Sequence, residues 1–258
     1  MRAVPSLAAL PKAPPLILFR SFLYFLWFGV VSVIMNVGAL PTLLMPRRAI
    51  VRTSQCWSRV LLWGLKHIAG LDWEVRGTIP QGGVLVASKH MSMWDTLALY
   101  MLLDDAVIVL KRELLNVPFY GWYLRKAHMI AIDRAAGASA LRQMAAQGKA
   151  VVAEGRPIVI FPEGTRKSPG APPDYKPGVA GLYGLLGVDC VPVALNSGLF
   201  WTGPMGFLKK PGRIIIEFLP PIPAGLGRAA FTALLEARTE TAAAKLIAEG
   251  RTALAAHS

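Results

Sequence analysis

The stretch VLVASKHMSMWD, residues 84–95, decides the fold of this chain, because a short apolar run passes directly into the start of a helical stretch. We expect a strand over Gly83–Ser88 and a helix over Trp94–Leu103. Strands that alternate with helices are typical of α/β domains. Functional residues in such domains gather at the carboxyl ends of the strands, and His90 and Asp95 stand at one such end.

The same alternation continues on both sides of this stretch, from about Asp72 onward. Further strands are expected at Trp73–Arg76, Ala106–Lys111, Met129–Asp133, Pro157–Phe161, Val191–Asn196 and Arg213–Leu219. Further helices are expected at Ala138–Glu154, Val179–Gly187 and Arg228–Ala255. The pattern predicts an α/β domain over residues 71–258, with a mixed, largely parallel sheet covered by helices on both faces.

Residues 1–70 differ from the rest of the chain and are expected to form a membrane-embedded helical segment. No charged residue lies between Ser21 and Pro46, and the part up to Leu40 is long enough to cross a bilayer as a helix. A turn within Asn36–Pro41, between two half-length helices, is the alternative, and a buried helix of a soluble protein is another. A cleaved signal peptide fits poorly, because no small-residue cleavage site follows the run.

The charge of the chain is concentrated beside this apolar run. The net charge is +13, yet the first acidic residue is Asp72, and eight Lys or Arg residues precede it. With 54% hydrophobic residues, the composition excludes a disordered chain. The larger basic cluster follows the run, which favours a cytoplasmic location for the rest of the chain at the inner membrane. Anionic lipid is therefore the expected partner, and nucleic acid is not, since no nucleic-acid-reading motif occurs.

A second helix is expected at Thr53–Gly70. Arg48, Arg52, Arg59 and Lys66 recur at spacings that place them on one helical face. Such a basic stripe can lie in the headgroup plane of an anionic leaflet. An ordinary surface helix packed on the domain is the alternative.

His90 and Asp95 form the first candidate catalytic pair. They stand five positions apart across a strand-to-helix turn, where the carboxylate can reach one imidazole nitrogen. The other nitrogen is then free to act as a base on a hydroxyl group. A structural His–Asp pair is the alternative reading of these two residues.

Two other strand ends carry candidate anion-binding residues. Phe161–Lys167 follows one strand; within it Gly164 allows close backbone approach, and Arg166 offers a planar fork suited to phosphate. Arg134 follows another strand and is a further candidate phosphate contact. Solvated turns with surface ion pairs are the alternative in both places.

Taken together, these motifs resemble the glycerolipid acyltransferases. The resemblance rests on His90-x4-Asp95, Phe161-Pro-Glu-Gly-Thr-Arg166 and Val191-Pro-Val-Ala194, and it covers about residues 70–220. It implies transfer of a fatty acyl chain from acyl-CoA or acyl carrier protein to the free sn-2 hydroxyl of 1-acylglycerol 3-phosphate. The product would be phosphatidic acid, an intermediate of phospholipid biosynthesis.

The resemblance also assigns roles to residues. His90 would be the general base and Asp95 its orienting partner. The expected acceptor site comprises Glu163, Gly164, Thr165, Arg166 and Arg134. It further implies an N-terminal helical pair embedded in one leaflet.

This chain departs from the family pattern in two places. Lys89 stands where many members have Asn, which adds a positive charge that could contact phosphate or lower the protonated fraction of His90. The Gly and Phe that usually precede the residue equivalent to Arg134 are missing. Acceptors other than 1-acylglycerol 3-phosphate, such as glycerol 3-phosphate or a lyso-aminolipid, therefore stay open. A non-catalytic membrane-anchored binding protein is the remaining alternative.

No cofactor is expected beyond the acyl carrier as cosubstrate. The two cysteines, Cys56 and Cys190, form no disulfide framework and no CxxC pair. The four histidines are scattered without zinc-ligand spacing, so no metal site is predicted.

Overall fold

The computed structural model describes residues 13–133, 136–203 and 206–256. Its α-helices are α1 (Pro15–Gly38), α2 (Arg47–Ala69), α3 (Met93–Leu102), α4 (Tyr120–Lys126), α5 (Gly137–Ala153), α6 (Pro177–Leu186) and α7 (Arg228–Ala255). Its strands are β1 (Leu71–Arg76), β2 (Leu85–Ser88), β3 (Val107–Lys111), β4 (Ile130–Ile132), β5 (Ile158–Ile160), β6 (Cys190–Leu195), β7 (Trp201–Thr202), β8 (Leu208–Lys209) and β9 (Gly212–Phe218). Short 3₁₀ helices among the described residues are η2 (Leu40–Leu44), η3 (Arg112–Asn116) and η5 (Ser197–Leu199).

Seven strands form one sheet in the order β1-β9-β6-β2-β5-β3-β4. All neighbouring pairs are parallel except β6 and β9, which are antiparallel. The short strands β7 and β8 pair separately. The expected α/β class with a mixed, largely parallel sheet is therefore confirmed. Each strand and helix predicted after residue 70 is present, with ends within two residues of the expected ones.

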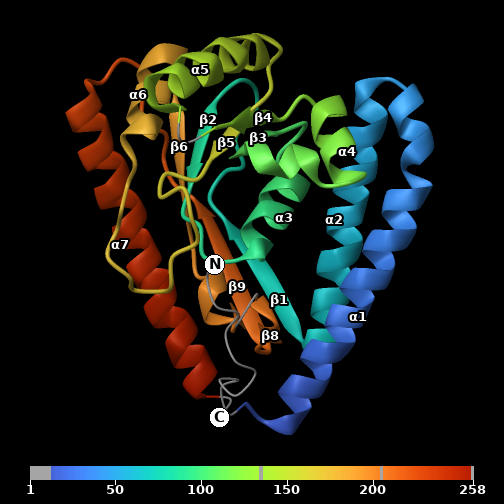
Figure 1. The fold of residues 1–258 in the computed structure, drawn as a ribbon. Helices are drawn as coiled ribbons and strands as arrows, with labels where there is room; N and C mark the ends of the chain where they lie inside the picture. The colour runs from blue at the N-terminus through green and yellow to red at the C-terminus, as the bar shows by residue number, and fades with distance from the viewer. Residues whose placement is uncertain (1–12, 134–135, 204–205, 257–258) are drawn as a thin grey trace.

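The two faces of the sheet pack against different helices, as the alternation of side chains along each strand requires. In β2, Val86 belongs to the apolar core under α2 and α3. Its neighbours Leu85 and Ala87 belong to the opposite core, under α5, α6 and the start of α7. Figure 1 shows α1 and α2 along one flank of the sheet and α7 along the other.

The N-terminal region is a helical hairpin, in which α1 and α2 run side by side (Figure 1). Close approach requires Gly64, because a Cβ atom there would lie 2.1 Å from the indole nitrogen of Trp27. The helix α1 has 24 residues and ends at Gly38, so the chain leaves the helix within the expected stretch Asn36–Pro41, although α1 is longer than a half-length helix. The reversal continues through η2 and Pro46, and α2 begins at Arg47, six residues earlier than expected.

The outer side of α1 exposes large apolar side chains to the surroundings. They are Leu16, Phe19, Phe22, Leu23, Phe25, Leu26, Val30, Val33, Ile34 and Val37. Residues 15–44 are long and apolar enough to cross a membrane, by length and composition. An exposed apolar face of this size is typical of a membrane contact, and it argues against a buried helix of a soluble protein.

The helix α2 is amphipathic in the way the basic stripe indicates. Its inner side buries residues such as Leu61, Leu62 and Leu65, whereas all four residues of the basic stripe are exposed. The helix ends at Ala69 and β1 begins at Leu71. The division into segments 1–70 and 71–258 therefore falls at a helix-to-strand turn, and it stays a prediction.

Candidate active site

The loop from β2 to α3 brings His90 and Asp95 together. Ser92 caps α3, and its hydroxyl accepts a hydrogen bond from the backbone N–H of Trp94. Asp95 completes this capping box: its Oδ2 accepts the backbone N–H groups of Met91 at 2.6 Å and Ser92 at 2.9 Å. The same oxygen lies 3.0 Å from Nδ1 of His90. The helix cap therefore fixes the carboxylate that orients the imidazole.

The second oxygen of Asp95 has hydroxyl partners. Its Oδ1 accepts hydrogen bonds from Ser92, at 3.3 Å, and from Ser197, at 2.5 Å. Asp95 is fully buried, so these donors offset the loss of water around its charge. Sequence reasoning missed Ser197. The available signal was its position two residues after β6, at the same sheet edge as His90.

The remaining nitrogen of His90, Nε2, is left to exchange a proton, because Asp95 occupies Nδ1. The imidazole stacks on the ring of Phe161, with centroids 4.0 Å apart and an interplanar angle of 22°. Phe161 follows β5, the strand next to β2. The two predicted motifs thus meet through ring contact at the carboxyl ends of adjacent parallel strands.

The turn after β5 closes on the His90 loop. Gly164 adopts a left-handed φ of 65°, which favours glycine, and its N–H donates to the carbonyl of Phe161. The N–H of Lys167 donates to the carbonyl of His90 at 2.9 Å. This backbone contact holds the Phe161–Lys167 segment against the histidine loop.

A cavity of about 1150 Å³ opens beside these loops. Its polar end is lined by His90 and the predicted residues Glu163, Gly164, Thr165 and Arg166. From there it extends over α3, β3 and α4 to the α1–α2 hairpin. Apolar residues of this extension include Leu97, Ile108, Leu110, Leu124, Met129, Ala39, Ile50, Trp57 and Met35. A cavity with one charged end and a long apolar extension suits an amphiphile.

Further cations line the same cavity and were not predicted as site residues. They are Lys111 at the end of β3, Lys176 before α6, and Arg228 at the start of α7. The sequence predicts that Lys111 ends a strand, but it does not show that this strand, β3, lies next to β5. Lys111 could therefore not be assigned to the site from the sequence. Lys176 is paired with Asp174, which lines the same cavity, at 2.7 Å. Lys111 and Arg228 therefore add the positive charge that suits the opening to an anionic headgroup or carrier.

Lys89 is not among the residues that line this cavity, and its predicted contact with phosphate stays a prediction. Its ammonium group is buried and lies 3.1 Å from Glu163 and 2.6 Å from Glu240 of α7. Burial raises the pKa of Glu163 above its ordinary value, and the neighbouring Lys89 offsets only part of this rise. Arg134 lies outside the described residues, so its predicted role stays a prediction.

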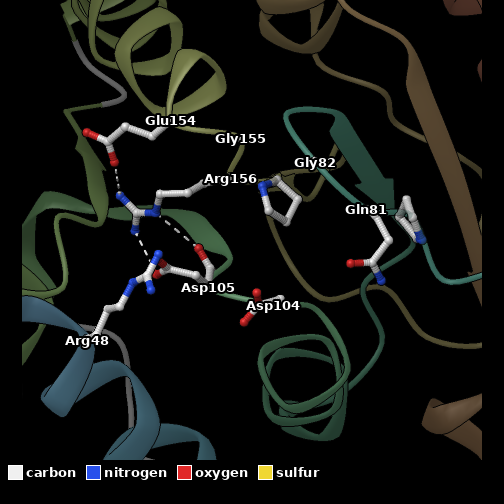
Figure 2. A pocket seen from close by; sticks show the side chains of 10 residues that line it. Arg48, Gln81, Gly82, Asp104, Asp105, Glu154, Gly155 and Arg156 are labelled. Carbon is white, nitrogen blue, oxygen red and sulfur yellow. Dashed lines mark hydrogen bonds and ion pairs between the residues drawn. The ribbon is translucent and has the colours of Figure 1, made fainter.

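A second, smaller hollow of about 200 Å³ is polar and contains no predicted site residue (Figure 2). It lies before β3 and β5, at the opposite end of these strands from His90. Arg48, Asp104, Asp105, Glu154 and Arg156 are among its lining residues. Figure 2 shows that Arg156 is occupied by ion pairs with Asp105 and Glu154. Asp105, Glu154 and Arg156 are therefore paired with one another, and Arg48 and Asp104 line the hollow beside them.

Within the described ranges, no group of three or more His, Cys, Asp or Glu side chains is arranged to hold a metal ion. Cys56 and Cys190 are both free thiols, the first exposed and the second buried.

Comparison with known proteins gives a family match and a fold match. A family model described as Acyltransferase matches residues 72–196. The 1-acyl-sn-glycerol-3-phosphate acyltransferase of Pseudomonas aeruginosa is 39% identical over 184 residues, which are 70% of this chain and 71% of that protein. The alpha enzyme of the same name from mouse is 30% identical over 169 residues, 64% of this chain and 59% of that protein.

A solved structure also matches. The crystal structure of the 1-acyl-sn-glycerophosphate acyltransferase from Thermotoga maritima aligns with a TM-score of 0.74, over 88% of this chain and 96% of that chain. At 18% sequence identity, this likeness concerns the fold.

Proposed function

Since the chain belongs to the acyltransferase family and is therefore an acyl-transferring enzyme, we propose that its acceptor is 1-acylglycerol 3-phosphate. It transfers a fatty acyl chain from an acyl thioester to the free sn-2 hydroxyl, and the product is phosphatidic acid for phospholipid biosynthesis. One observation carries this proposal. The His90–Asp95 pair stands at the charged end of a large apolar cavity, beside Arg166.

In the proposed mechanism, His90 acts as a general base. Nε2 of the neutral imidazole takes the proton of the acceptor hydroxyl while the hydroxyl oxygen attacks the thioester carbonyl. Asp95 keeps the proton on Nδ1 and stabilises the imidazolium that forms. When the tetrahedral intermediate collapses, the carbon–sulfur bond breaks and the imidazolium proton passes to the departing thiolate. No acyl-enzyme is formed in this scheme.

Arg166 is the proposed anchor for the acceptor phosphate, because its planar fork can donate two parallel hydrogen bonds to phosphate oxygens. Lys111 lines the same cavity and is a second cation within this part of the site. The backbone at Gly164 and Thr165 completes the acceptor site beside them. Arg134 is proposed as a further phosphate ligand on its sequence position alone.

The apolar extension of the cavity is proposed to hold the fatty acyl chain. Its far end is lined by residues of α1 and α2, including Met35 and Trp57. A substrate could therefore enter from the lipid side without exposing its chain to water. The donor is an acyl thioester of coenzyme A or of acyl carrier protein; both carriers are anionic and suit a cationic opening.

The proposed location is the inner membrane, with the catalytic domain facing the cytoplasm. The apolar side of α1 would lie among lipid chains, while the exposed basic stripe of α2 would meet anionic headgroups. The larger basic cluster after the apolar run supports this orientation.

An acceptor panel tests the proposal. Purified protein in detergent is given one acyl donor and, in turn, lysophosphatidic acid, glycerol 3-phosphate or a lyso-aminolipid. The expected result is thiol release that depends on lysophosphatidic acid. Faster release with another acceptor would reassign the substrate, and no release with any acceptor would contradict the proposed function.

The phosphate role of Arg166 is tested in the same assay. Arg166→Ala should raise the acceptor KM strongly, whereas Arg251→Ala, an exposed site near the end of α7, should leave it unchanged. Unchanged acceptor kinetics in Arg166→Ala would remove this residue from the acceptor site.

A further inference from the structure

Three segments far apart in the sequence meet at one buried cation. The Nζ atom of Lys89 lies 3.1 Å from Oε1 of Glu163 and 2.6 Å from Oε1 of Glu240. Lys89 comes from the β2–α3 loop, Glu163 from the turn after β5, and Glu240 from the middle of α7. The Tyr175 hydroxyl donates a further hydrogen bond to Glu240 at 3.0 Å.

Two of these charges, Lys89 and Glu163, are buried, whereas Glu240 is partly exposed. The side chains of Lys89 and Glu163 are only 3% and 1% exposed. The second carboxylate oxygen of Glu163, Oε2, is buried and has no hydrogen-bond partner among the described residues. Glu163 is one of the residues that line the cavity, but its side chain is almost fully buried and is held by Lys89.

The cation sits at the joint between the two catalytic loops. Lys89 directly precedes His90, and Glu163 lies two residues after Phe161, on which the His90 ring stacks. The backbone contact from Lys167 to His90 joins the same two loops. A displacement of Lys89 or Glu163 would therefore move the base relative to Arg166.

Within the proposed function, on which this inference rests, we propose that Lys89, Glu163 and Glu240 are positioning residues. The ion pairs that the buried ammonium of Lys89 makes with Glu163 and with the partly exposed Glu240 hold the His90 loop and the Phe161–Arg166 turn in register. Glu163 thus acts through Lys89 and makes no contact with the acceptor. The third member, Glu240, lies beyond residues 72–196, the part that matches the family model, so α7 supports the active site of this chain.

Kinetics of single variants separate positioning from acceptor binding. Lys89→Met, Glu163→Gln and Glu240→Gln should each lower kcat about tenfold or more, with the acceptor KM within about twofold of wild type. Glu236→Gln, one helical turn before Glu240, is the matched control and should behave as wild type. A selective rise of acceptor KM in Glu163→Gln, without a fall in kcat, would instead make Glu163 an acceptor ligand and overturn the proposal.

A double variant tests the coupling between the charges. Removing one member of a buried ion pair leaves the other unpaired, whereas removing both does not. Lys89→Met combined with Glu163→Gln should therefore lose no more activity than Lys89→Met alone. Multiplied losses would show that the two residues act independently, which contradicts a shared network. A lower melting temperature with unchanged kcat of the folded protein would reduce the network to stability alone.

Hydrogen exchange distinguishes failure of this proposal from failure of the proposed function, because it needs no turnover. The probe is amide exchange in residues 88–96 and 161–167 of the detergent-solubilised full chain. Both segments should exchange faster in Lys89→Met and return toward wild type in the double variant, with Glu236→Gln unchanged. Wild-type exchange in Lys89→Met would overturn the network, whether or not the wild type acylates lysophosphatidic acid.

Discussion

The hydroxyl of Ser197 donates a hydrogen bond to Oδ1 of Asp95 across 102 positions of sequence. Asp95 is thereby held from two elements, the cap of α3 and the segment that follows β6. Because both oxygens of the carboxylate accept hydrogen bonds, the carboxylate has a fixed position beside Nδ1 of His90. This relationship makes Ser197 part of the support for His90.

We predict that Ser197→Ala lowers kcat with little change in either KM. Loss of a hydrogen bond to a buried carboxylate costs about 1–3 kcal/mol, which corresponds to a loss of about fivefold to about 150-fold in kcat if it is felt in full in the transition state. Steady-state kinetics on the purified protein measure it. Ser139→Ala, at an exposed hydroxyl of α5, is the control. A wild-type kcat in Ser197→Ala would mean that the α3 cap alone suffices.

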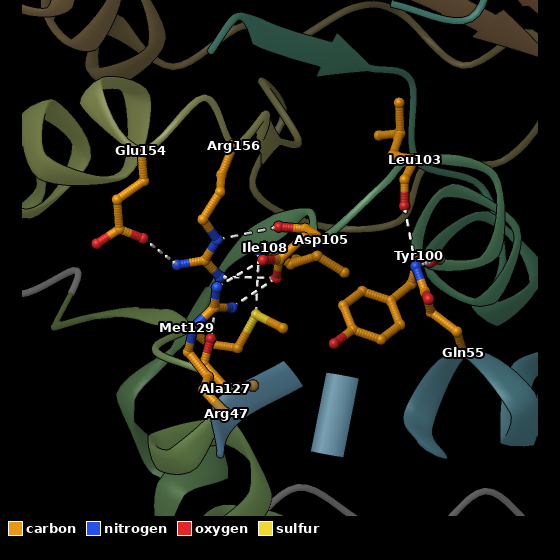
Figure 3. A network of polar contacts seen from close by, with 10 residues as sticks. All are labelled: Arg47, Gln55, Tyr100, Leu103, Asp105, Ile108, Ala127, Met129, Glu154 and Arg156. Carbon is orange, nitrogen blue, oxygen red and sulfur yellow. Dashed lines mark hydrogen bonds and ion pairs between the residues drawn. The ribbon is translucent and has the colours of Figure 1, made fainter. Parts of the chain in front are cut away.

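The hairpin is joined to the domain by a charge cluster at the start of α2 (Figure 3). Arg47 donates two hydrogen bonds of 2.6 Å to the carboxylate of Asp105. Arg156, which is almost fully buried, lies 3.3 Å from the same carboxylate and donates to the carbonyls of Asp105 and Ala127. Asp105 therefore forms ion pairs with two arginines, Arg47 and Arg156.

We predict unequal losses of stability when this cluster is broken. Arg47→Ala leaves Asp105 paired with Arg156 and should cost about 1 kcal/mol. Asp105→Asn leaves the buried Arg156 with only the exposed carboxylate of Glu154 as an ionic partner and should cost about 3 kcal/mol. Asparagine is chosen because Asp105 has a φ of 47°, which asparagine tolerates. Denaturant unfolding in detergent measures both, with exposed Asp104→Asn as control. Equal losses would contradict this assignment.

A buried lysine predicts a pH dependence of stability. Burial lowers the pKa of Lys209 from 10.5 to about 8. Its Nζ donates to the carbonyls of Gly206 and Phe207 and lies over the ring of Trp201. Between pH 8 and about 10.5 the unfolded chain keeps a proton that the folded chain releases, so this residue makes stability rise with pH.

Melting temperatures at pH 7.5 and pH 9.5 check this sign. Wild type should gain stability relative to Lys209→Met over that interval, since methionine has no proton to release. A constant difference between the two proteins at both pH values would show that the pKa of Lys209 is not lowered.

Elements with regular apolar patterns could be predicted from the sequence. The strand ending at Ser88 and the helix after it follow from a short apolar run that passes directly into a helical stretch, which is a local signal. The strands β7 and β8 could not be predicted, because two residues carry no period. Helix α4 was also missed; it is only seven residues long and follows Phe119, which has a positive φ of 61°.

The pairing of His90 with Asp95 could be predicted because both belong to one turn. The ion-pair partners of Lys89 could not be predicted, since Glu240 is 151 positions away in the sequence. The charge of a lysine does not indicate which way its side chain points. Lys89 was read as a possible phosphate contact, whereas its ammonium faces two carboxylates. The role of Ser197 could not be predicted either, because its contact with Asp95 depends on the order of strands in the sheet.

The role of His90 is tested most directly by thiol release from an acyl thioester in the presence of lysophosphatidic acid. Wild type should release thiol and form phosphatidic acid. His90→Ala should lose activity by about a hundredfold or more, while it remains folded and membrane-bound. His67→Ala, at an exposed histidine of α2, should remain active. Turnover of His90→Ala at the wild-type rate would contradict general-base catalysis by His90 and, with it, the proposed mechanism.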